Sequence, residues 1–260
     1  MMNRSDEGSM RIDYTNRNVV ITGAFRGIGL GIAEGFAAAG ARLHLIDIEA
    51  SVMDVASKLG ATASVADISD KAEVAAALKP LEQIDVLINN AGLELMTPLE
   101  DGSDKAADDF RRVIEINIIG TTLVTTLALP RMVSGAAVIN TASIWGRVSE
   151  PRFGAYVASK HAIIGLTKTW ATELGPRGIR VNAVCPGWVR TEASMRSLGR
   201  MAAEEQVPED ILLERIMSGQ ALPGLMEPAD MASTYLFLGS SLAANITGQT
   251  LGVDRGEVPW

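Results

Sequence analysis

The stretch GAYVASKHAII, residues 154–164, places Tyr156 and Lys160 four positions apart. Four residues span about one helical turn, so both side chains would leave the same helical face and their polar ends could meet. A tyrosine hydroxyl has an unperturbed pKa of about 10, and a neighbouring ammonium favours its anion. Such a pair could move a proton to or from an alcohol oxygen. Taken alone, the spacing favours an ordinary structural turn. A catalytic role for the pair needs support from motifs elsewhere in the chain.

A glycine-rich turn, TGAFRGIG, separates an apolar run at 18–22 from an Ala-rich helical stretch at 27–40. Its glycines, Gly23, Gly27 and Gly29, permit positive φ and close backbone approach. A helix that starts here offers free N–H groups and a positive dipole end to a pyrophosphate. The spacing G-x-x-x-G-x-G differs from the G-x-G-x-x-G fingerprint, and a plain packing turn is the alternative. The position between strand and helix favours a dinucleotide site.

An acid, Asp47, ends the next apolar run at 41–47. A carboxylate at this distance from the glycine turn would accept hydrogen bonds from an adenine ribose and repel a 2′-phosphate. We therefore predict NAD as the cofactor. Arg26, beside the turn, could pair with a 2′-phosphate and keeps NADP as the less favoured alternative. The structural alternative for Asp47 is a solvated turn acid.

Strand and helix signals alternate along the whole chain. Several strand candidates are continuous in Val, Ile and Ala, which is typical of buried parallel strands. We predict a Rossmann-like, doubly wound, mostly parallel seven-stranded α/β sheet with helices on both faces and ligands at the carboxyl ends of its strands. The predicted strands are 18–22, 41–47, 62–67, 84–90, 136–143, 179–186 and 250–254. The predicted helices are 27–40, 50–60, 70–80, 103–130, 154–175 and 228–239.

The domain organisation follows from length and from one irregular segment. A chain of 260 residues fits a single α/β domain. We expect residues 1–14 to be a flexible N-terminal segment and 15–260 to form one catalytic domain. Within it, 187–225 is predicted as an irregular substrate loop, because Gly199, Pro208, Pro223 and Gly224 interrupt its helical stretches.

Composition narrows the function classes. The formal net charge is −8 and no dense basic run is present, which argues against a nucleic-acid partner. The start is polar, and we find no apolar run of about 18 residues, so we predict no membrane partner and a cytoplasmic location. One cysteine, Cys185, and two histidines, His44 and His161, leave little for a metal centre. We predict no metal site.

Six motifs stand in one order: TGAFRGIG, NNAG (89–92), Asn117, Ser143, YVASK and PGWVRT (186–191). With these motifs the chain resembles the short-chain dehydrogenase/reductase family, from about residue 15 to the C-terminus. The resemblance implies a catalytic set of Asn117, Ser143, Tyr156 and Lys160. It implies a homotetramer formed through the long helices. One departure is VDRGE near the C-terminus, where the family commonly has DGG, and this puts the C-terminal contacts in question.

The resemblance also implies the cofactor contacts. It places Asp67 at the adenine ring, and Val189 and Thr191 at the carboxamide and phosphates. The full predicted set is Gly23, Arg26, Gly27, Ile28, Gly29, Asp47, Asp67, Ile68, Asn89, Ala91, Gly92, Tyr156, Lys160, Pro186, Gly187, Val189 and Thr191.

The implied reaction is hydride transfer between NAD(H) and a secondary alcohol or ketone. Tyr156 would exchange the proton, Ser143 would stabilise the oxyanion, and Asn117 is expected from the family to orient a water near Lys160. We predict substrate contacts from Ser143, Trp145, Tyr156 and Trp188. Further residues that the fold would turn toward the substrate are Glu94, Ile144, Glu150, Arg152, Phe153, Met195 and Arg196.

The mixed character of these residues suits a polyol, a sugar or a hydroxy acid. The alternative enzyme is an NADPH-dependent 3-oxoacyl reductase, which Arg26 would favour. The non-enzyme alternative is a catalytically silent dinucleotide-sensing protein.

Overall fold

The computed structural model describes residues 12–259 and contains one seven-stranded sheet. The strand order is β3-β2-β1-β4-β5-β6-β7, and every neighbouring pair is parallel. This confirms the predicted fold class. The strands are β1 (Asn18–Thr22), β2 (Arg42–Asp47), β3 (Thr62–Val65), β4 (Ile84–Asn89), β5 (Met132–Thr141), β6 (Arg180–Pro186) and β7 (Thr250–Val253).

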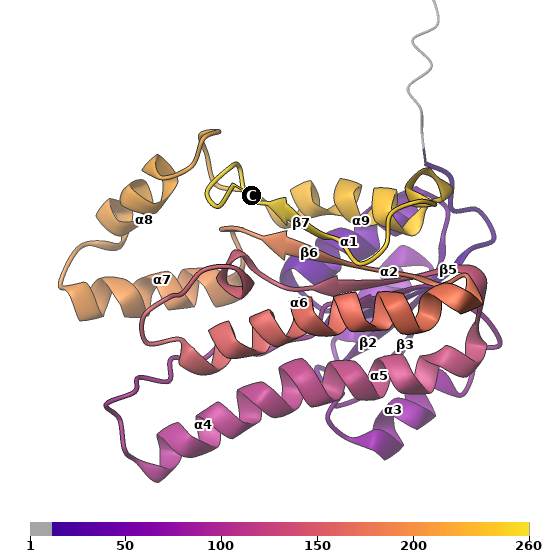
Figure 1. The fold of residues 1–260 in the computed structure, drawn as a ribbon, viewed down its shortest axis with the longest axis horizontal. Helices are drawn as coiled ribbons and strands as arrows, with labels where there is room; N and C mark the ends of the chain where they lie inside the picture. The colour runs from indigo at the N-terminus through magenta and orange to yellow at the C-terminus, as the bar shows by residue number, and fades with distance from the viewer. Residues whose placement is uncertain (1–11, 260) are drawn as a thin grey trace, which may run out of the picture.

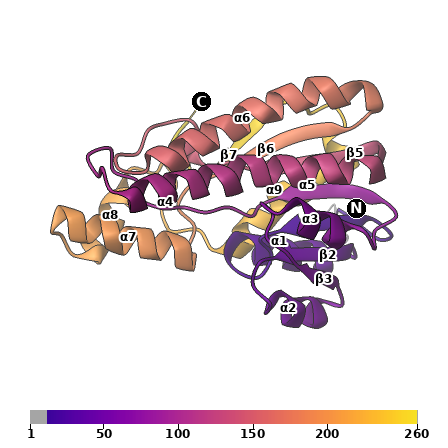
Figure 2. The same cartoon turned by 90° about the horizontal axis from the view of Figure 1, so that it is seen from below.

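Helices cover both faces of the sheet (Figures 1 and 2). Strand β1 shows why its sequence is continuously apolar: Val19 and Ile21 contact one helix layer, and Val20 contacts the other. The first layer contains α1 (Gly27–Ala38), α2 (Val52–Leu59) and α9 (Ala232–Gly239). The second contains α3 (Lys71–Leu78), α4 (Asp104–Ile114), α5 (Thr121–Ala128) and α6 (Gly154–Leu174).

The order of strands reverses at β1, whose neighbours are β2 on one side and β4 on the other. The connections that leave β1 and β4 therefore run to opposite faces and separate at the carboxyl edge. In sheets of this kind, the separation creates a crevice in which ligands bind.

The long helix predicted at 103–130 is interrupted by a π-helical segment, Glu115–Gly120, between α4 and α5. Asn117 lies in this segment and is 2% exposed. Short π-helical insertions in α-helices are frequently found at functional sites, because the extra residue re-aims a side chain. The segment turns the Asn117 carboxamide toward the loop after β4.

One helical stretch in the described residues, Asp104–Arg131, contains an 18-residue window that is long and apolar enough to cross a membrane. From the sequence we expected no apolar run of about 18 residues. The stretch still has a high mean hydropathy, because the Thr and Gly residues that interrupt its Ile, Leu and Val are only weakly hydrophilic. The stretch lies in a helix layer of the domain, where it contacts α3 and α6 (Figure 2). Of the window, 39% is buried.

The segment 187–225 is mostly helical, so the predicted irregular loop is wrong in its secondary structure. It forms α7 (Glu192–Glu205) and α8 (Glu209–Ser218), which extend beyond the sheet (Figure 1). Thr191 caps α7 with a capping box that Ser194 completes. Gly199 lies inside α7 rather than ending it, while Pro208 is the N-cap residue of α8. We call α7 and α8 the lid helices.

Residues 1–11 of the predicted flexible segment lie outside the described residues. Ordered packing begins before the predicted boundary at residue 15, since Tyr14 is 2% exposed and its ring contacts Phe36. Near the other end, Arg255 has a positive φ of 55° and donates to the carbonyl oxygen of Pro223. This non-glycine turn ties the C-terminal strand to the segment that follows α8.

Candidate active site

A cavity of about 410 Å³ lies at the carboxyl edge of the sheet. It is bounded by the glycine turn, the ends of β2, β4, β5 and β6, the first turns of α6, and the start of α7. Most of the residues predicted from the sequence line this one cavity. They are Gly23, Arg26, Gly27, Ile28, Asp47, Asp67, Ile68, Ala91, Gly92, Ser143, Trp145, Tyr156, Lys160, Pro186, Gly187, Trp188, Val189 and Thr191.

The glycine turn could not be built from larger residues. A Cβ on Gly23, whose φ is 66°, would lie 2.7 Å from the Cα of Ala91, and one on Gly29 would lie 1.9 Å from the carbonyl oxygen of Gly23. Within the described residues, the N-cap residue Arg26 makes no side-chain bond to the first turn of α1. The first N–H groups of α1 are therefore available to an anion, and the turn fits a pyrophosphate.

The carboxylate of Asp47 is held at the other side of this turn. It accepts hydrogen bonds from the backbone N–H of Phe25 at 2.9 Å and of Glu49 at 3.0 Å. Each carboxylate oxygen keeps a second acceptor site. Arg26 forms an ion pair with Glu192 on α7 at 3.2 Å, and both side chains are exposed. The acid is thus oriented by the backbone, whereas the guanidinium is engaged with the lid.

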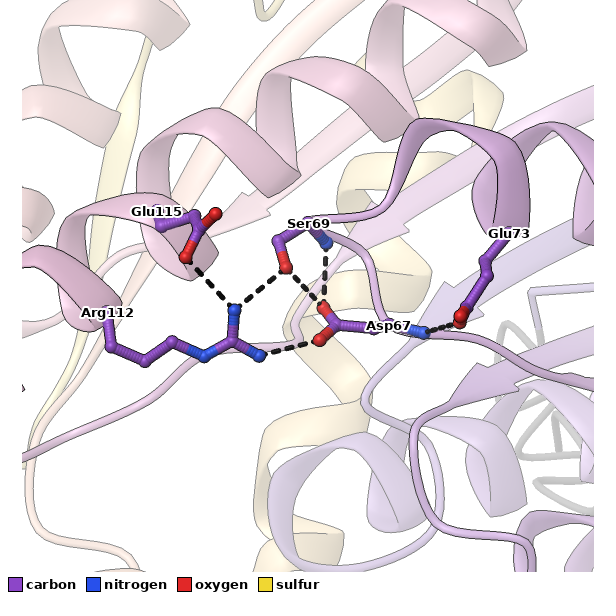
Figure 3. A network of polar contacts seen from close by, with 5 residues as sticks. All are labelled: Asp67, Ser69, Glu73, Arg112 and Glu115. Carbon is purple, nitrogen blue, oxygen red and sulfur yellow. Dashed lines mark hydrogen bonds and ion pairs between the residues drawn. The ribbon is translucent and has the colours of Figure 1, made fainter.

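Asp67 lies in a polar network that links β3 to α4 (Figure 3). Its carboxylate accepts from Arg112 at 2.6 Å and from the hydroxyl of Ser69 at 2.6 Å. Burial favours a higher pKa, but the bonds from Ser69 and Arg112 outweigh it and lower the pKa of Asp67. Arg112 itself lines the cavity and is not among the predicted residues. Nothing near it in the sequence indicates this role.

Tyr156 and Lys160 face the cavity from one side of α6. The Lys160 Nζ donates to the carbonyl oxygen of Thr141 at 2.8 Å and lies 5.3 Å from the ring centroid of Tyr156. Burial lowers the pKa of Lys160 to about 8, against an opposing effect of Glu94. Burial and the charge of Glu94 raise the pKa of Tyr156, and a hydrogen bond with Ser143 opposes the rise. The site therefore holds a neutral phenol beside an ammonium.

Asn117 lies behind the cavity rather than on its lining. Its carboxamide bonds the backbone of Leu93 at both ends, accepting from the N–H at 2.7 Å and donating to the carbonyl oxygen at 2.9 Å. It also donates to the hydroxyl of Ser159 at 2.9 Å. In these contacts Asn117 fixes the loop after β4 against α6, next to Lys160.

The structure does not bring Asn89 or the Gly29 Cα to the cavity lining. Asn89 ends β4, and strand alternation turns its side chain into the domain, where it donates to Thr125 and Asn140. The next residue, Asn90, lines the cavity and donates to the carbonyl oxygen of Gly23 at 3.0 Å. The period-two alternation of a strand could have identified Asn90 from the sequence.

Aromatic side chains form the wall at the substrate end. Trp145 meets both Tyr156, at 5.9 Å between ring centroids, and Trp188, at 6.2 Å, edge to face. Phe153 packs behind Trp145 at 4.9 Å. Of the other expected substrate residues, Glu94, Ile144 and Arg196 line the cavity.

Four residues expected to face the substrate do not line the cavity: Glu150, Arg152, Phe153 and Met195. Arg152 instead pairs with Glu204 on the lid at 2.7 Å. In the described part of the chain, no three His, Cys, Asp or Glu side chains are grouped to hold a metal ion.

Comparison with known proteins extends over nearly the whole chain. Residues 23–257 match the family model described as enoyl-(acyl carrier protein) reductase. Oxidoreductase UcpA of Escherichia coli K12 is 39% identical over 257 residues, covering 94% of this chain and 95% of that protein. Galactitol 2-dehydrogenase (L-tagatose-forming) of Cereibacter sphaeroides is 36% identical, with coverages of 92% and 94%. D-beta-hydroxybutyrate dehydrogenase of Cupriavidus necator is 33% identical, with coverages of 93% and 98%.

The fold has close counterparts among solved structures. A Brucella melitensis protein titled short-chain dehydrogenase/reductase SDR:Glucose/ribitol dehydrogenase aligns with a TM-score of 0.84 and 31% identity, covering 96% of this chain and 100% of that one. Sequence and fold agree along the same residues. The chain belongs to the short-chain dehydrogenase/reductase family of oxidoreductases.

Proposed function

We propose that the protein transfers a hydride between NAD(H) and a secondary alcohol or its ketone. Members of this family use NAD(P), and its relatives act on CH–OH groups. The observation that carries the proposal is that Ser143, Tyr156 and Lys160 share one cavity with the glycine turn and Asp47. A proton-transfer group and a dinucleotide site are thus joined in a single space.

When bound, the nicotinamide would supply the hydride acceptor or donor. The protein's part is proton transfer and orientation. During reduction the Tyr156 hydroxyl donates its proton to the developing alkoxide and becomes a phenolate; during oxidation that phenolate accepts the alcohol proton, with the Ser143 hydroxyl donating to the same oxygen. The ammonium of Lys160 stabilises the phenolate that forms, and Thr141 fixes that ammonium at the end of β5. Trp145 and Trp188 give this end of the cavity an apolar wall.

The orientation of Asp47 supports NAD over NADP. Its carboxylate is fixed by two backbone N–H groups beside the glycine turn, where a 2′-phosphate would meet a negative charge. Glu192 competes with a 2′-phosphate for the guanidinium of Arg26. That exposed pair is weak, so the preference depends mainly on Asp47.

The test is a screen of polyols, sugars and hydroxy acids with NAD⁺ and NADP⁺, following absorbance of the reduced cofactor. We expect turnover with NAD⁺ to exceed that with NADP⁺. Better turnover with NADP(H), especially on a 3-oxoacyl thioester, would favour the reductase alternative. Binding of NAD(H) with no turnover of any alcohol or ketone would favour a silent dinucleotide sensor.

The cytoplasmic location and the homotetramer stay predictions. Exposed apolar side chains on the α4–α5 stretch support an interface with further copies, since Phe110 is 43% and Ile119 51% exposed. Light scattering after size-exclusion chromatography measures the assembly. A monomer at micromolar concentration would contradict the tetramer.

A further inference from the structure

Glu94 brings a carboxylate into the substrate end of the cavity. It lies in the loop after β4 and lines the same space as Ser143, Tyr156 and Arg196. Within residues 12–259, its hydrogen-bond donor is the hydroxyl of Ser197, on lid helix α7. An ionised carboxylate offers about four acceptor sites over its two oxygens. Glu94 therefore keeps acceptor capacity for a molecule that occupies the cavity.

Three positive charges act on Glu94: Lys160, Arg196 and the exposed Arg200. Lys160 donates to the carbonyl oxygen of Thr141, and Arg196, 42% exposed, lies 3.8 Å from a carboxylate oxygen of Glu192. Burial raises the pKa of Glu94, while the hydrogen bond from Ser197 and the charges of Lys160, Arg196 and Arg200 oppose the rise. The carboxylate of Glu94 is thus partly buried, with Ser197 as its hydrogen-bond donor among the described residues.

Two more carboxyls, Glu150 and Glu257, lie outside the cavity lining, and the charge of Glu94 reaches Glu150. Burial and the charges of Glu205, Glu257 and Glu94 raise the pKa of Glu150. Glu257 lies behind Gly187, where an added Cβ would come within 3.4 Å of its Oε2. An anionic substrate would meet repulsion from Glu94, whereas a hydroxyl would find an acceptor.

We propose that Glu94 determines substrate specificity by accepting a hydrogen bond from a second hydroxyl, so that the site selects neutral polyhydroxy substrates over hydroxy acids. The inference rests on the proposed hydride transfer at the same cavity. Ser197 is a positioning residue, because it holds the carboxylate from the lid. The opposite preference, for a hydroxy acid, would require the positive charges of Arg196 and Arg200 to outweigh Glu94.

Three four-carbon probes separate these outcomes: 2-butanol, 2,3-butanediol and 3-hydroxybutyrate, each as mixed stereoisomers. The measurement is kcat/KM with the preferred cofactor. Each probe is also tested as a competitive inhibitor of the best substrate from the screen, so that the binding of a probe can be compared even if the protein does not turn that probe over. We expect the unaltered protein to favour the diol over 2-butanol by about tenfold or more, the value of a charge-assisted hydrogen bond.

The isosteric Glu94→Gln variant should lower kcat/KM for the diol by roughly tenfold and change that for 2-butanol by less than about threefold. The same variant should raise kcat/KM for 3-hydroxybutyrate, because a negative charge that repels the substrate carboxylate is removed. Glu100→Gln is the matched control, since this carboxyl belongs to the same loop but is exposed and pairs with Arg152 at 3.5 Å. Glu100→Gln should leave kcat/KM for all three probes unchanged.

Ser197→Ala keeps the carboxylate and loses its positioning. We expect a higher KM for the diol with kcat within about threefold of the unaltered value. Melting temperatures show whether either variant is misfolded. If Glu94→Gln is misfolded, Ser197→Ala provides the test.

Equal losses on the diol and 2-butanol in Glu94→Gln, or a preference of the unaltered protein for 3-hydroxybutyrate, would overturn the role of Glu94 alone. Absence of turnover with every alcohol and both cofactors would instead remove the proposed function, and the inference with it.

Discussion

The carboxylate of Asp47 and the backbone N–H of Phe25 are joined by a hydrogen bond of 2.9 Å, which ties the end of β2 to the glycine turn. Asp47→Asn keeps an acceptor for this bond but removes the charge. We expect NAD to bind about tenfold more weakly relative to NADP, because a charge-assisted bond is lost and the repulsion of a 2′-phosphate ends. Titration with NADH and NADPH by fluorescence measures the ratio of the two affinities.

Asp54→Asn, on the exposed side of α2, is the control. Tighter binding of NADP by the unaltered protein would sink the assignment.

Tyr156→Phe removes the proton-transfer group and keeps the ring that contacts Trp145. We expect kcat to fall by roughly 10²–10⁴-fold, the range for loss of a general acid or base. Affinity for NADH should change little, which fluorescence titration checks. Unchanged turnover on the alcohols that the protein oxidises would refute the mechanism.

Lys160→Met should abolish turnover yet stabilise the fold near neutral pH. Burial lowers the pKa of Lys160 from 10.5 to about 8, so the folded state carries a desolvated ammonium below pH 8. This difference in pKa corresponds to a gain of at most about 3 kcal/mol in the free energy of unfolding of the variant. The loss of the hydrogen bond to Thr141 reduces that gain. As pH rises from about 8 to 10.5, the native lysine gives up its proton while the unfolded chain keeps its own, so the unaltered protein gains stability.

The advantage of Lys160→Met should therefore shrink over that pH interval. Urea unfolding at pH 7, 9 and 10.5 measures it. A gain in stability that is constant with pH would show that the ammonium is not the cause.

Arg112→Met removes the partner of Asp67. We expect a loss of up to about 1 kcal/mol in the free energy of unfolding, because both side chains are partly exposed. The lowered pKa of Asp67 makes this contribution complete above the unfolded pKa of about 4, and it disappears as pH falls through the lower folded-state value. Urea unfolding at pH 7 and pH 3 measures both. Arg111→Met, whose partner Asp108 is exposed, is the matched control. Equal losses at both pH values would rule out the ion pair.

The sequence predicted the elements whose signal is local. The order of strands and helices, the glycine turn and the Tyr156–Lys160 pair all depend on residues within one or two turns of each other. The Arg112–Asp67 pair joins residues 45 positions apart, and neither segment indicates the other. Such contacts depend on how α4 lies beside the loop that follows β3 and cannot be derived from spacing.

Two errors show where local rules fail. Gly199 has the local signal of a helix breaker, yet it lies within α7, where a Cβ would be 3.0 Å from Glu209 Oε1. The atom it would meet is the end of an exposed, flexible side chain, and the helix continues through Gly199 because a single glycine costs only about 1 kcal/mol relative to alanine. For Asn89, the error is one residue: the strand turns one amide into the domain and the next to the cavity.

The lid helix α7 spans both ends of the cavity. It starts at Thr191, whose methyl group would lie 3.2 Å from a Cβ on Gly27, and about two turns later Ser197 contacts Glu94. One helix thereby contacts both the glycine turn and Glu94, the group that we propose to bind the substrate. We expect an ordered kinetic scheme, in which the dinucleotide adds first and leaves last, and product-inhibition patterns report this sequence.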